Sequence, residues 1–315
     1  MANQITTAAL QSHIETWLAA FHPGSSLFRI WQLNGGISSA MTAFSFTHDG
    51  ETRTYILRQP NDWSLSNIPD CVRDEYSRLG ALHRGGLPVQ APVFCDETDR
   101  NFGRPGFVIE FVDGAPDLNP QDLSDYLDQF ARRLSQIHSF DTHVPDLAVP
   151  VKRTRSFERF RDETPPQADP VYQVERIWKV LAASDWQSVN DQVLLHGDYW
   201  PGNILWRGGV LVAVIDWEEP EINDPLLDLA ISRLDLWWVF GRQAMEDFTE
   251  RYLALRPIDT TLLPAWDLRS ALRPASNIEV WAAAYTPLER PDITADYMLK
   301  THAGFVEQAM DALAH

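Results

Sequence analysis

HGDYWPGNILW, from His196 to Trp206, and VIDWEEPEINDPLLDLA, from Val214 to Ala230, are the two neighbouring segments that decide the fold of this chain. The strand-like run 203–206 and the apolar run 211–215 are separated by Arg207-Gly208-Gly209. Two short strands joined by a turn that contains glycine are typical of a β-hairpin. We therefore predict that these two runs pair with each other.

This hairpin would carry Asn203 at its start and Asp216 directly after its end, so that both side chains meet at one end of the ribbon. An amide oxygen and a carboxylate suit Mg²⁺, which prefers oxygen ligands and completes its shell with water and substrate phosphates. Asp198 lies on the same loop and can orient a hydroxyl group. Phosphoryl transfer needs positioning, metal and charge neutralisation, with little covalent chemistry from the protein. The pattern therefore predicts a phosphoryl-transfer site.

At these residues the chain resembles the aminoglycoside phosphotransferase family, which is similar to choline kinases and, distantly, to protein kinases. Three motifs carry the resemblance in order and with matching spacing: His196-Gly197-Asp198 with Asn203, Ile215-Asp216-Trp217-Glu218, and Asp224-Pro225 with Asp228-Leu229-Ala230. Asn223 stands where the family usually has glycine, but Asn also tolerates a left-handed backbone. The arginine that protein kinases place before the catalytic Asp is absent.

The resemblance implies that ATP, or alternatively GTP, donates a phosphoryl group to the hydroxyl of a small molecule. Asp198 would accept a hydrogen bond from that hydroxyl and act as the base. Asn203 and Asp216 would hold Mg²⁺ against the phosphates. His196 would brace the loop, and Asp228 would accept hydrogen bonds from the backbone of the catalytic loop.

The fold class implied by the resemblance is α+β, a two-lobed protein-kinase-like fold with an N-terminal antiparallel sheet lobe and a mainly helical C-terminal lobe. Strands dominate before the apolar run 107–112 and helices dominate after it. We therefore expect a nucleotide-binding lobe at 1–112 and a helical lobe at 113–315 that contains the catalytic loop and the substrate site.

Hydrophobic periodicity predicts the remaining elements. Helices are expected at 8–21, around Glu75, at 121–140, along one apolar side after Leu226, at 245–255 and at 295–313, and strands at 27–33, 41–46, 53–58, 89–94 and 107–112.

The turn between the first two strands contains Gly35, Gly36, Ser38 and Ser39, which could approach and hydrogen-bond a phosphate. The alternative is an ordinary hairpin turn with two glycines. Arg58, in the third strand, stands where kinase-like folds place a phosphate-binding lysine. Its forked guanidinium could bind two phosphate oxygens. The alternative is an exposed residue at the end of a strand.

Glu75 falls on the apolar stripe of its helix, three positions after Val72 and four before Leu79. An inward carboxylate needs a partner, and we expect an ion pair with Arg58 that positions it for phosphate. Asp74 is the competing residue, and Glu75 could instead reach water from the edge of the stripe. The resemblance also implies that backbone groups of Glu110, Phe111 and Val112 meet the base of the nucleotide.

Acidic and aromatic residues near the catalytic loop are candidates for the acceptor site, namely Trp200, Glu218, Glu219, Glu221, Asp235 and Trp237. Such a lining suits an amine-bearing polyol through charge pairing and cation–π contacts. The alternatives are surface charge for the carboxylates and core packing for the tryptophans. The family includes antibiotic, choline, homoserine and sugar-amine kinases, and the sequence singles out none of them.

A basic patch of Arg153, Arg155, Arg159 and Arg161 lies near two phenylalanines. We expect salt bridges, such as one from Arg159 to Glu163 four positions later, with contact to substrate as the alternative. His138, at the end of the helix 121–140, is expected to pack or cap.

Composition narrows the class of protein. The formal net charge of the 315 residues is −18, which argues against nucleic acid as a partner and is compatible with a cationic substrate. No run approaches the roughly 20 apolar residues of a membrane span, and two cysteines give no disulfide framework. We expect a cytoplasmic enzyme, monomeric or homodimeric.

The rival functions are a non-catalytic nucleotide-binding pseudokinase and a protein Ser/Thr kinase. Against the protein kinase, Asp224 follows Asp216 too closely for a long activation loop.

Overall fold

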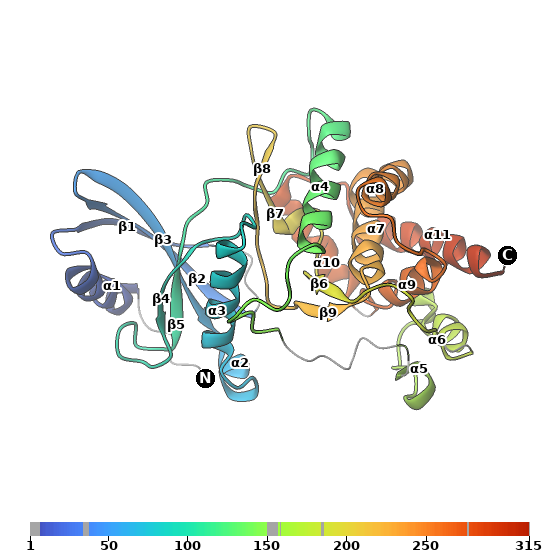
Figure 1. Cartoon of the computed structure of the whole chain (residues 1–315), viewed down its shortest axis with the longest axis horizontal. Helices are drawn as coiled ribbons and strands as arrows, with labels where there is room; N and C mark the ends of the chain where they lie inside the picture. The colour runs from blue at the N-terminus through green and yellow to red at the C-terminus, as the bar shows by residue number, and fades with distance from the viewer. Residues whose placement is uncertain are drawn as a thin grey trace. The chain divides into compact units, whose positions relative to one another are not determined.

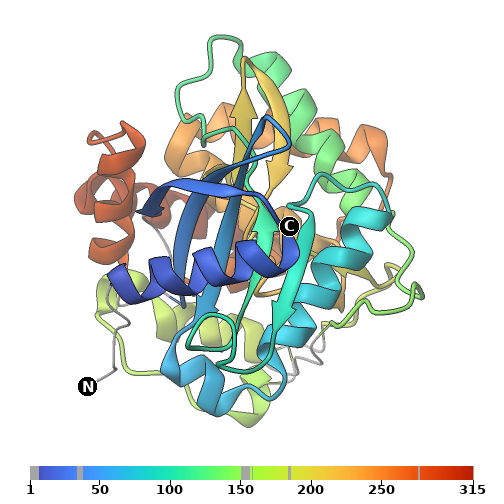
Figure 2. The same cartoon turned by 90° about the vertical axis from the view of Figure 1, so that its left-hand side faces the viewer.

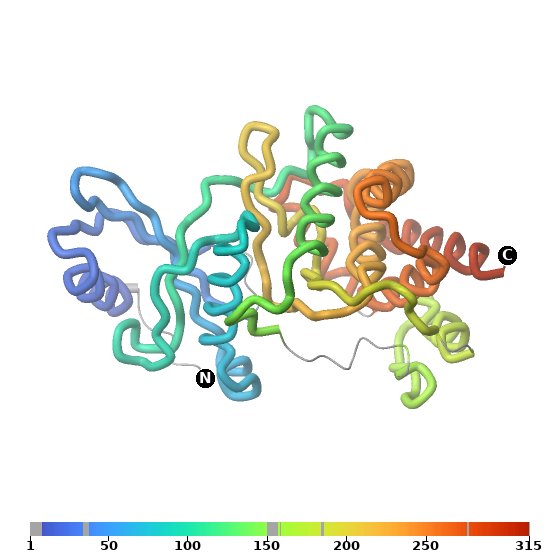
Figure 3. Tube along the Cα trace, in the orientation of Figure 1, coloured from blue at the N-terminus to red at the C-terminus, as the bar shows by residue number. Residues whose placement is uncertain are grey.

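The computed structural model describes residues 7–33, 38–149, 157, 159–183, 186–275 and 277–314 (Figures 1 and 3). Its internal contacts divide the chain into two units, Met1–Asp113 with His143–Ala148, and Gly114–Thr142 with Val149–His315. The short segment 143–148 thus belongs to the first unit, although it follows the first helix of the second.

The first unit is built on one antiparallel sheet. Its elements are α1 (Thr7–Phe21), β1 (Ser26–Gln32), β2 (Ser39–His48), β3 (Glu51–Pro60), α2 (Asp62–Asn67), α3 (Cys71–Arg84), β4 (Pro92–Asp96) and β5 (Gly106–Glu110). The strands lie in the order β1-β2-β3-β5-β4, and every neighbouring pair is antiparallel.

Alternation of side chains along β3 separates the two faces of this sheet. Tyr55 and Leu57 join a buried cluster that includes Trp17 of α1, and Figure 2 shows α1 lying across the strands. The next residue, Arg58, must therefore face the opposite side. There it contacts α3, whose Tyr76 ring also packs edge-on against Phe107 at 6.3 Å.

Three expectations for this unit are wrong in detail. The strand predicted at 89–94 begins only at Pro92, because the Val89 N–H turns back to the Leu87 carbonyl at 2.9 Å. The strand predicted to reach Val112 ends at Glu110. Helix α2 was not predicted, although Asn61, which caps it by accepting from the Ser64 N–H at 2.8 Å, is the residue type that announces a helix.

The second unit is mainly helical. Its regular elements are α4 (Leu123–Ile137), α5 (Arg159–Asp162), α6 (Val174–Ala182), β6 (Val193–Leu195), β7 (Ile204–Arg207), β8 (Val210–Val214), β9 (Glu221–Asn223), α7 (Leu226–Phe240), α8 (Arg242–Leu255), α9 (Leu263–Ser270), α10 (Ile278–Tyr285) and α11 (Ala295–Ala314). Short 3₁₀ turns lie at Pro170–Tyr172, Pro201–Asn203 and Thr286–Leu288.

Helix α7 forms the centre of this unit. It packs against α8, α9 and α11 (Figure 1), and it is buried almost without interruption from Leu226 to Val239. The sequence analysis expected an apolar side on this helix, and the structure also buries polar residues such as Asp228 and Ser232. A helix buried all round can hold polar groups only if they have partners.

Two small ribbons flank the loop 196–203. The predicted hairpin is confirmed, with Ile204 opposite Val214 in the β7–β8 pair. The pairing of β6 with β9 was not predicted, and it sets Leu195 opposite Glu221. Together the two ribbons fix both ends of the segment 196–203.

None of the helices in the described parts of the chain is both long enough and apolar enough to cross a membrane.

Candidate active site

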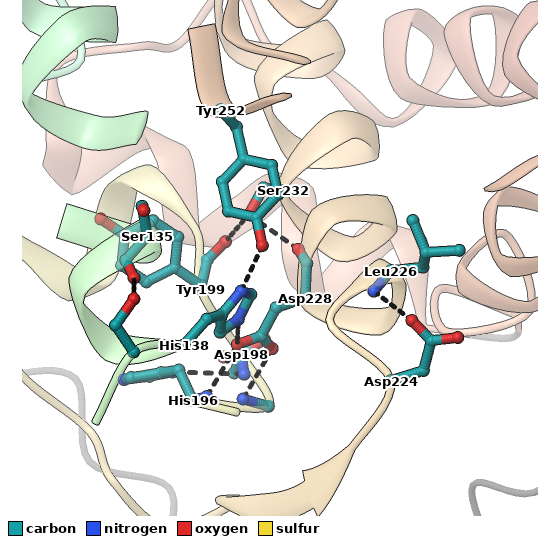
Figure 4. A network of polar contacts seen from close by, with 12 residues as sticks. Ser135, His138, His196, Asp198, Tyr199, Asp224, Leu226, Asp228, Ser232 and Tyr252 are labelled. Carbon is teal, nitrogen blue, oxygen red and sulfur yellow. Dashed lines mark hydrogen bonds and ion pairs between the residues drawn. The ribbon is translucent and has the colours of Figure 1, made fainter. Parts of the chain in front are cut away.

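The loop that contains Asp198 is anchored on Asp228 of α7 (Figure 4). The His196 N–H donates to Asp228 Oδ2 at 2.7 Å, and the Gly197 N–H donates to Asp228 Oδ1 at 2.8 Å. These bonds are the backbone contact that the sequence analysis assigned to Asp228. Ser232, one turn later on α7, donates to the Tyr199 carbonyl at 2.7 Å. Helix α7 therefore holds the loop backbone at His196, Gly197 and Tyr199.

Asp228 is itself completely buried and lies beside His138. His138 Nε2 is 3.3 Å from Asp228 Oδ2, and His138 Nδ1 is 2.6 Å from the Tyr252 hydroxyl. Burial lowers the pKa of His138, which favours a neutral ring that donates to Asp228 and accepts from Tyr252. Burial alone would raise the pKa of Asp228, but hydrogen bonds from His138 and from the His196 amide outweigh it, and the pKa is lowered.

The sequence analysis expected His138 to pack or cap, and it is the C-cap residue of α4, but its contact with Asp228 was not predicted and Tyr252 was not found. No local signal connects them to the loop, since they lie on α4 and α8, far from Asp228 along the chain.

His196 connects the catalytic loop to the end of β8. Its ring is fully buried, and Nε2 is 2.9 Å from the Ile215 carbonyl oxygen. The other ring nitrogen accepts from the Asp198 N–H at 3.2 Å, so a neutral ring with its proton on Nε2 satisfies both contacts. The ring also packs on Trp217 at 4.6 Å. His196 thus joins the segment of Asp198 to the residue that precedes Asp216.

Asn203 makes a second connection between these segments. Its amide nitrogen donates to the Asp198 backbone carbonyl at 3.0 Å and to Asp198 Oδ2 at 3.1 Å. Its own backbone carbonyl accepts from the Ile215 N–H at 2.9 Å. Because the nitrogen of the amide faces Asp198, the oxygen is directed away from that carboxylate.

Asp216 is exposed and has a backbone φ of 65°, in the left-handed region. Non-glycine residues rarely adopt this conformation, which is common at functional positions. This backbone conformation changes the direction of the chain just after β8 and so sets the direction of the Asp216 carboxylate. An exposed carboxylate and an amide oxygen on joined segments fit the hard-cation chemistry of Mg²⁺. No group of three or more His, Cys, Asp or Glu ligands occurs among the described residues, so such an ion would need phosphate and water oxygens as well.

Arg273 is a further residue of this site that the sequence analysis missed. Its guanidinium forms an ion pair with Asp198 Oδ1 and a second one with Asp235 Oδ2 at 3.1 Å. It also lies over the Trp281 ring, 5.4 Å from its centre. Burial raises the pKa of Asp235 to about 7, with Arg273 opposing the shift. No motif marks Arg273, which lies 75 positions after Asp198.

The candidate acceptor residues are distributed unevenly. Trp200 packs over Gly202, where an added Cβ would lie 2.2 Å from the indole, and it meets Tyr285 edge-on at 5.9 Å. Asp235 is joined to Asp198 through Arg273. Trp237 instead packs against Phe305 of α11 at 5.8 Å. Among the acidic candidates after Asp216, Glu218 is half-buried, Glu219 is exposed and Glu221 is buried.

The first unit contains the expected ion pair. Arg58 Nε is 2.9 Å from Glu75 Oε1, and the two side chains are only 9% and 13% exposed. Asp74 is not the partner. Ser39 is buried at the start of β2, and the Ser38 carbonyl accepts from the Asn61 N–H at 2.8 Å.

The other predicted nucleotide contacts are less complete. Gly35 and Gly36 lie outside the described residues. The Glu110 N–H donates to the Ala91 carbonyl at 2.9 Å and the Phe111 N–H donates to the Thr54 carbonyl at 3.1 Å. These two N–H groups serve the sheet, and the contact of the backbone of Glu110, Phe111 and Val112 with the nucleotide base stays a prediction.

In the basic patch, the predicted ion pair between Arg159 and Glu163 is present at 3.2 Å. Arg159 also lies over the Trp178 ring, 5.5 Å from its centre. Arg153 and Arg155 lie outside the described residues.

Comparison with known proteins places the chain in a family. A model described as "Phosphotransferase enzyme family" matches residues 31–267. Human acyl-CoA dehydrogenase family member 11 is 28% identical over 251 residues, which cover 70% of this chain and 32% of that protein. The chain thus spans about a third of the length of these relatives. Stress response kinase A of Escherichia coli (strain K12) is 24% identical over 283 residues, which cover 83% of this chain and 82% of that protein.

Among solved structures, a thermostable mutant of aminoglycoside phosphotransferase APH(4)-Ia, in a ternary complex with ADP and hygromycin B, has a TM-score of 0.59. It is 18% identical and covers 93% of this chain and 98% of that chain. This likeness confirms the predicted fold class. The family model spans well over half of the sequence, and the chain therefore belongs to the phosphotransferase enzyme family.

Proposed function

We propose that this chain is a Mg²⁺-ATP-dependent small-molecule kinase that transfers the γ-phosphoryl group to a hydroxyl of its acceptor. The observation that carries the proposal is the bonding between the two segments of the site. Asn203 holds the Asp198 carboxylate at 3.1 Å, and its backbone carbonyl is bonded to Ile215, directly before Asp216. A base and two oxygen ligands for a cation are thereby fixed relative to one another.

Asp198 is the group that accepts the hydrogen bond of the acceptor hydroxyl and orients it for in-line attack. General-base help of this kind contributes typically about 10²–10⁴-fold in rate. Asn203 directs that carboxylate through its amide nitrogen, while its amide oxygen and the Asp216 carboxylate would hold Mg²⁺. The ion would neutralise phosphate charge in the transferred group. His196 and Asp228 keep the loop in place and touch no reactant.

Arg58, held by Glu75, would contact the phosphates of the nucleotide. An arginine fixed by a buried carboxylate loses little further side-chain freedom when it binds phosphate. Ser38, Ser39, Gly35 and Gly36 would supply further donors, and Val112 would meet the base of the nucleotide. ATP is the preferred donor and GTP is the alternative.

The test is a coupled ADP-release assay with Mg²⁺-ATP and a panel of aminoglycosides, macrolides, choline, homoserine and amino sugars, with Asp198→Asn alongside. A hit that Asp198→Asn abolishes, while nucleotide binding survives, supports the kinase. Turnover that persists in Asp198→Asn contradicts the role of the base. Binding of ATP that Mg²⁺ does not tighten would favour a pseudokinase, and stimulation by casein-type proteins would favour a protein kinase.

Asp216→Ala tests the metal ligand separately by titration calorimetry with Mg²⁺-ADP. The matched control is Asp311→Ala, which removes an exposed carboxylate from α11. We expect Asp216→Ala alone to lose the Mg²⁺-dependent part of nucleotide binding. An unchanged titration would contradict the assignment.

A further inference from the structure

The environment of Arg273 has the composition of a cation-binding site. Asp198 and Asp235 supply two carboxylates to the guanidinium, and Trp281 supplies a ring face at 5.4 Å. Carboxylates and aromatic faces are the groups by which proteins bind ammonium and guanidinium ligands. In this chain the site next to the proposed base already contains a cation, and that cation is a side chain of the protein itself.

Arg273 is firmly held in this position. The preceding helix, α9, is fixed by a buried ion pair from Arg233 to Asp267 at 2.9 Å. The Ala271 carbonyl is 2.7 Å from His302 Nε2, and the Arg273 N–H donates to the Ser270 carbonyl at 3.0 Å. The backbone up to Arg273 is thus tied to the core of the second unit, so the guanidinium is a built-in part of the site.

The charges allow one conclusion about the acceptor. Arg273 stays protonated at every physiological pH, and it offsets at least one of the two carboxylates that it bridges. A second cation placed against Asp198 would meet the guanidinium at close range, where like charges are costly in a partly buried site. The side chain of Asp235 is only 5% exposed, and its Oδ2 atom forms an ion pair with Arg273.

We propose that Arg273 determines acceptor specificity: it fills the cation site beside Asp198, excludes amine-bearing acceptors, and leaves uncharged or acidic hydroxyl compounds as the substrate class. The inference rests on the proposed function and narrows it. It also departs from the expectation, drawn from the acidic lining, that a cationic polyol is the acceptor. An acidic acceptor would gain from the guanidinium directly, and a neutral one would avoid the repulsion.

The experiment measures cation binding to the whole chain, with no need for turnover. Wild type, Arg273→Ala and Arg273→Lys are titrated with choline, glucosamine and methylguanidinium in the presence of Mg²⁺-ADP, by calorimetry and by thermal stability. Arg269→Ala is the matched control, because Arg269 lies in the last turn of α9, four positions before Arg273, and its guanidinium lies over the Trp266 ring, 5.6 Å from its centre. We expect Arg273→Ala to bind these cations at least about tenfold more tightly than wild type (about 1.4 kcal/mol), with methylguanidinium raising its melting temperature. Arg273→Lys and Arg269→Ala should bind these cations with the affinity of wild type.

Equal cation binding by wild type and Arg273→Ala would overturn the proposal, as would phosphorylation of choline or glucosamine by wild type with Arg273 in place. If Arg273→Ala does not fold, Arg273→Met, which keeps the length of the side chain, takes its place. Acceptor arms with glycerol and glycerate then separate neutral from acidic substrates. The test also separates this proposal from the proposed kinase function. If the kinase function were wrong, no acceptor would give ADP release, while the change in cation binding between wild type and Arg273→Ala would persist.

Discussion

Asp228→Asn is the sharpest structural perturbation of the catalytic loop, because it keeps the size of the side chain and removes only an acceptor and a charge. Asp228 Oδ1 receives the Gly197 N–H, and Oδ2 receives both the His196 N–H and His138 Nε2. In either orientation, the new NH₂ group faces at least one buried donor. A buried polar group left unsatisfied costs about 1–3 kcal/mol, and hydrogen bonds to a charged acceptor contribute about 1.5–3 kcal/mol each. We therefore expect a loss of about 2–4 kcal/mol in the free energy of unfolding.

Urea denaturation of the full chain measures this loss, with Asp292→Asn as the control. Asp292 is paired with Arg290 at 2.8 Å, but its side chain is 63% exposed, and exposed pairs contribute less than about 1 kcal/mol. ADP release should fall in Asp228→Asn even under conditions where the protein is fully folded, because the loop amides lose their anchor. If Asp228→Asn were no less stable than Asp292→Asn, the reasoning about the loop would be refuted.

Three further predictions concern other parts of the molecule. Glu75→Gln removes the charge that pairs with Arg58, and we expect the affinity for Mg²⁺-nucleotide, measured by calorimetry, to fall by about tenfold. The exposed control Glu51→Gln should bind the nucleotide as wild type does. Gly202→Ala places a Cβ 2.2 Å from the Trp200 ring, so the indole must move at a cost on the order of 1–3 kcal/mol, visible as a lower melting temperature and slower turnover; unchanged values for both would show that Trp200 is not held there. The pKa of Asp235 is raised to about 7 in the folded chain, so its contribution to stability is present at low pH and is lost as pH rises from its unfolded value toward 7. The stability of wild type relative to Asp235→Asn, from denaturation at pH 5 and pH 8, should therefore decrease at the higher pH, and a constant or rising difference would contradict the assignment.

The parts of the fold that the sequence predicted are those set by local patterns. The period of Leu10, Ile14 and Leu18 located α1, and the glycines between β7 and β8 located the hairpin, because helix periodicity and turn chemistry act over a few residues. The place of Glu75 on the apolar stripe of its helix, together with the position of Arg58 in the resemblance, was enough to predict their ion pair. The start of β4 was missed because a backbone hydrogen bond from Val89 decides it, and side-chain patterns do not record such bonds.

The same distinction between local patterns and distant contacts applies to the candidate site. Its motif residues lie close in sequence, so their spacing carries information about their geometry. Arg273, in the turn after α9, contacts Asp198 of the loop directly, whereas His138 supports Asp228 and Tyr252 supports His138, and only tertiary packing brings these residues together. Most of the missed residues contact polar residues of the buried helix α7 or their partners, and these contacts join segments that are distant in the sequence.

The central claim is that this site transfers a phosphoryl group from ATP to a hydroxyl under the control of Asp198. The most direct measurement is ³¹P NMR of wild type and Asp198→Asn incubated with Mg²⁺-ATP and pooled hydroxyl compounds. The account predicts a new phosphomonoester resonance that grows with ADP in wild type and is absent in Asp198→Asn. A phosphomonoester formed equally by both proteins, or ATP consumption by wild type that yields only inorganic phosphate across every acceptor pool, would contradict it.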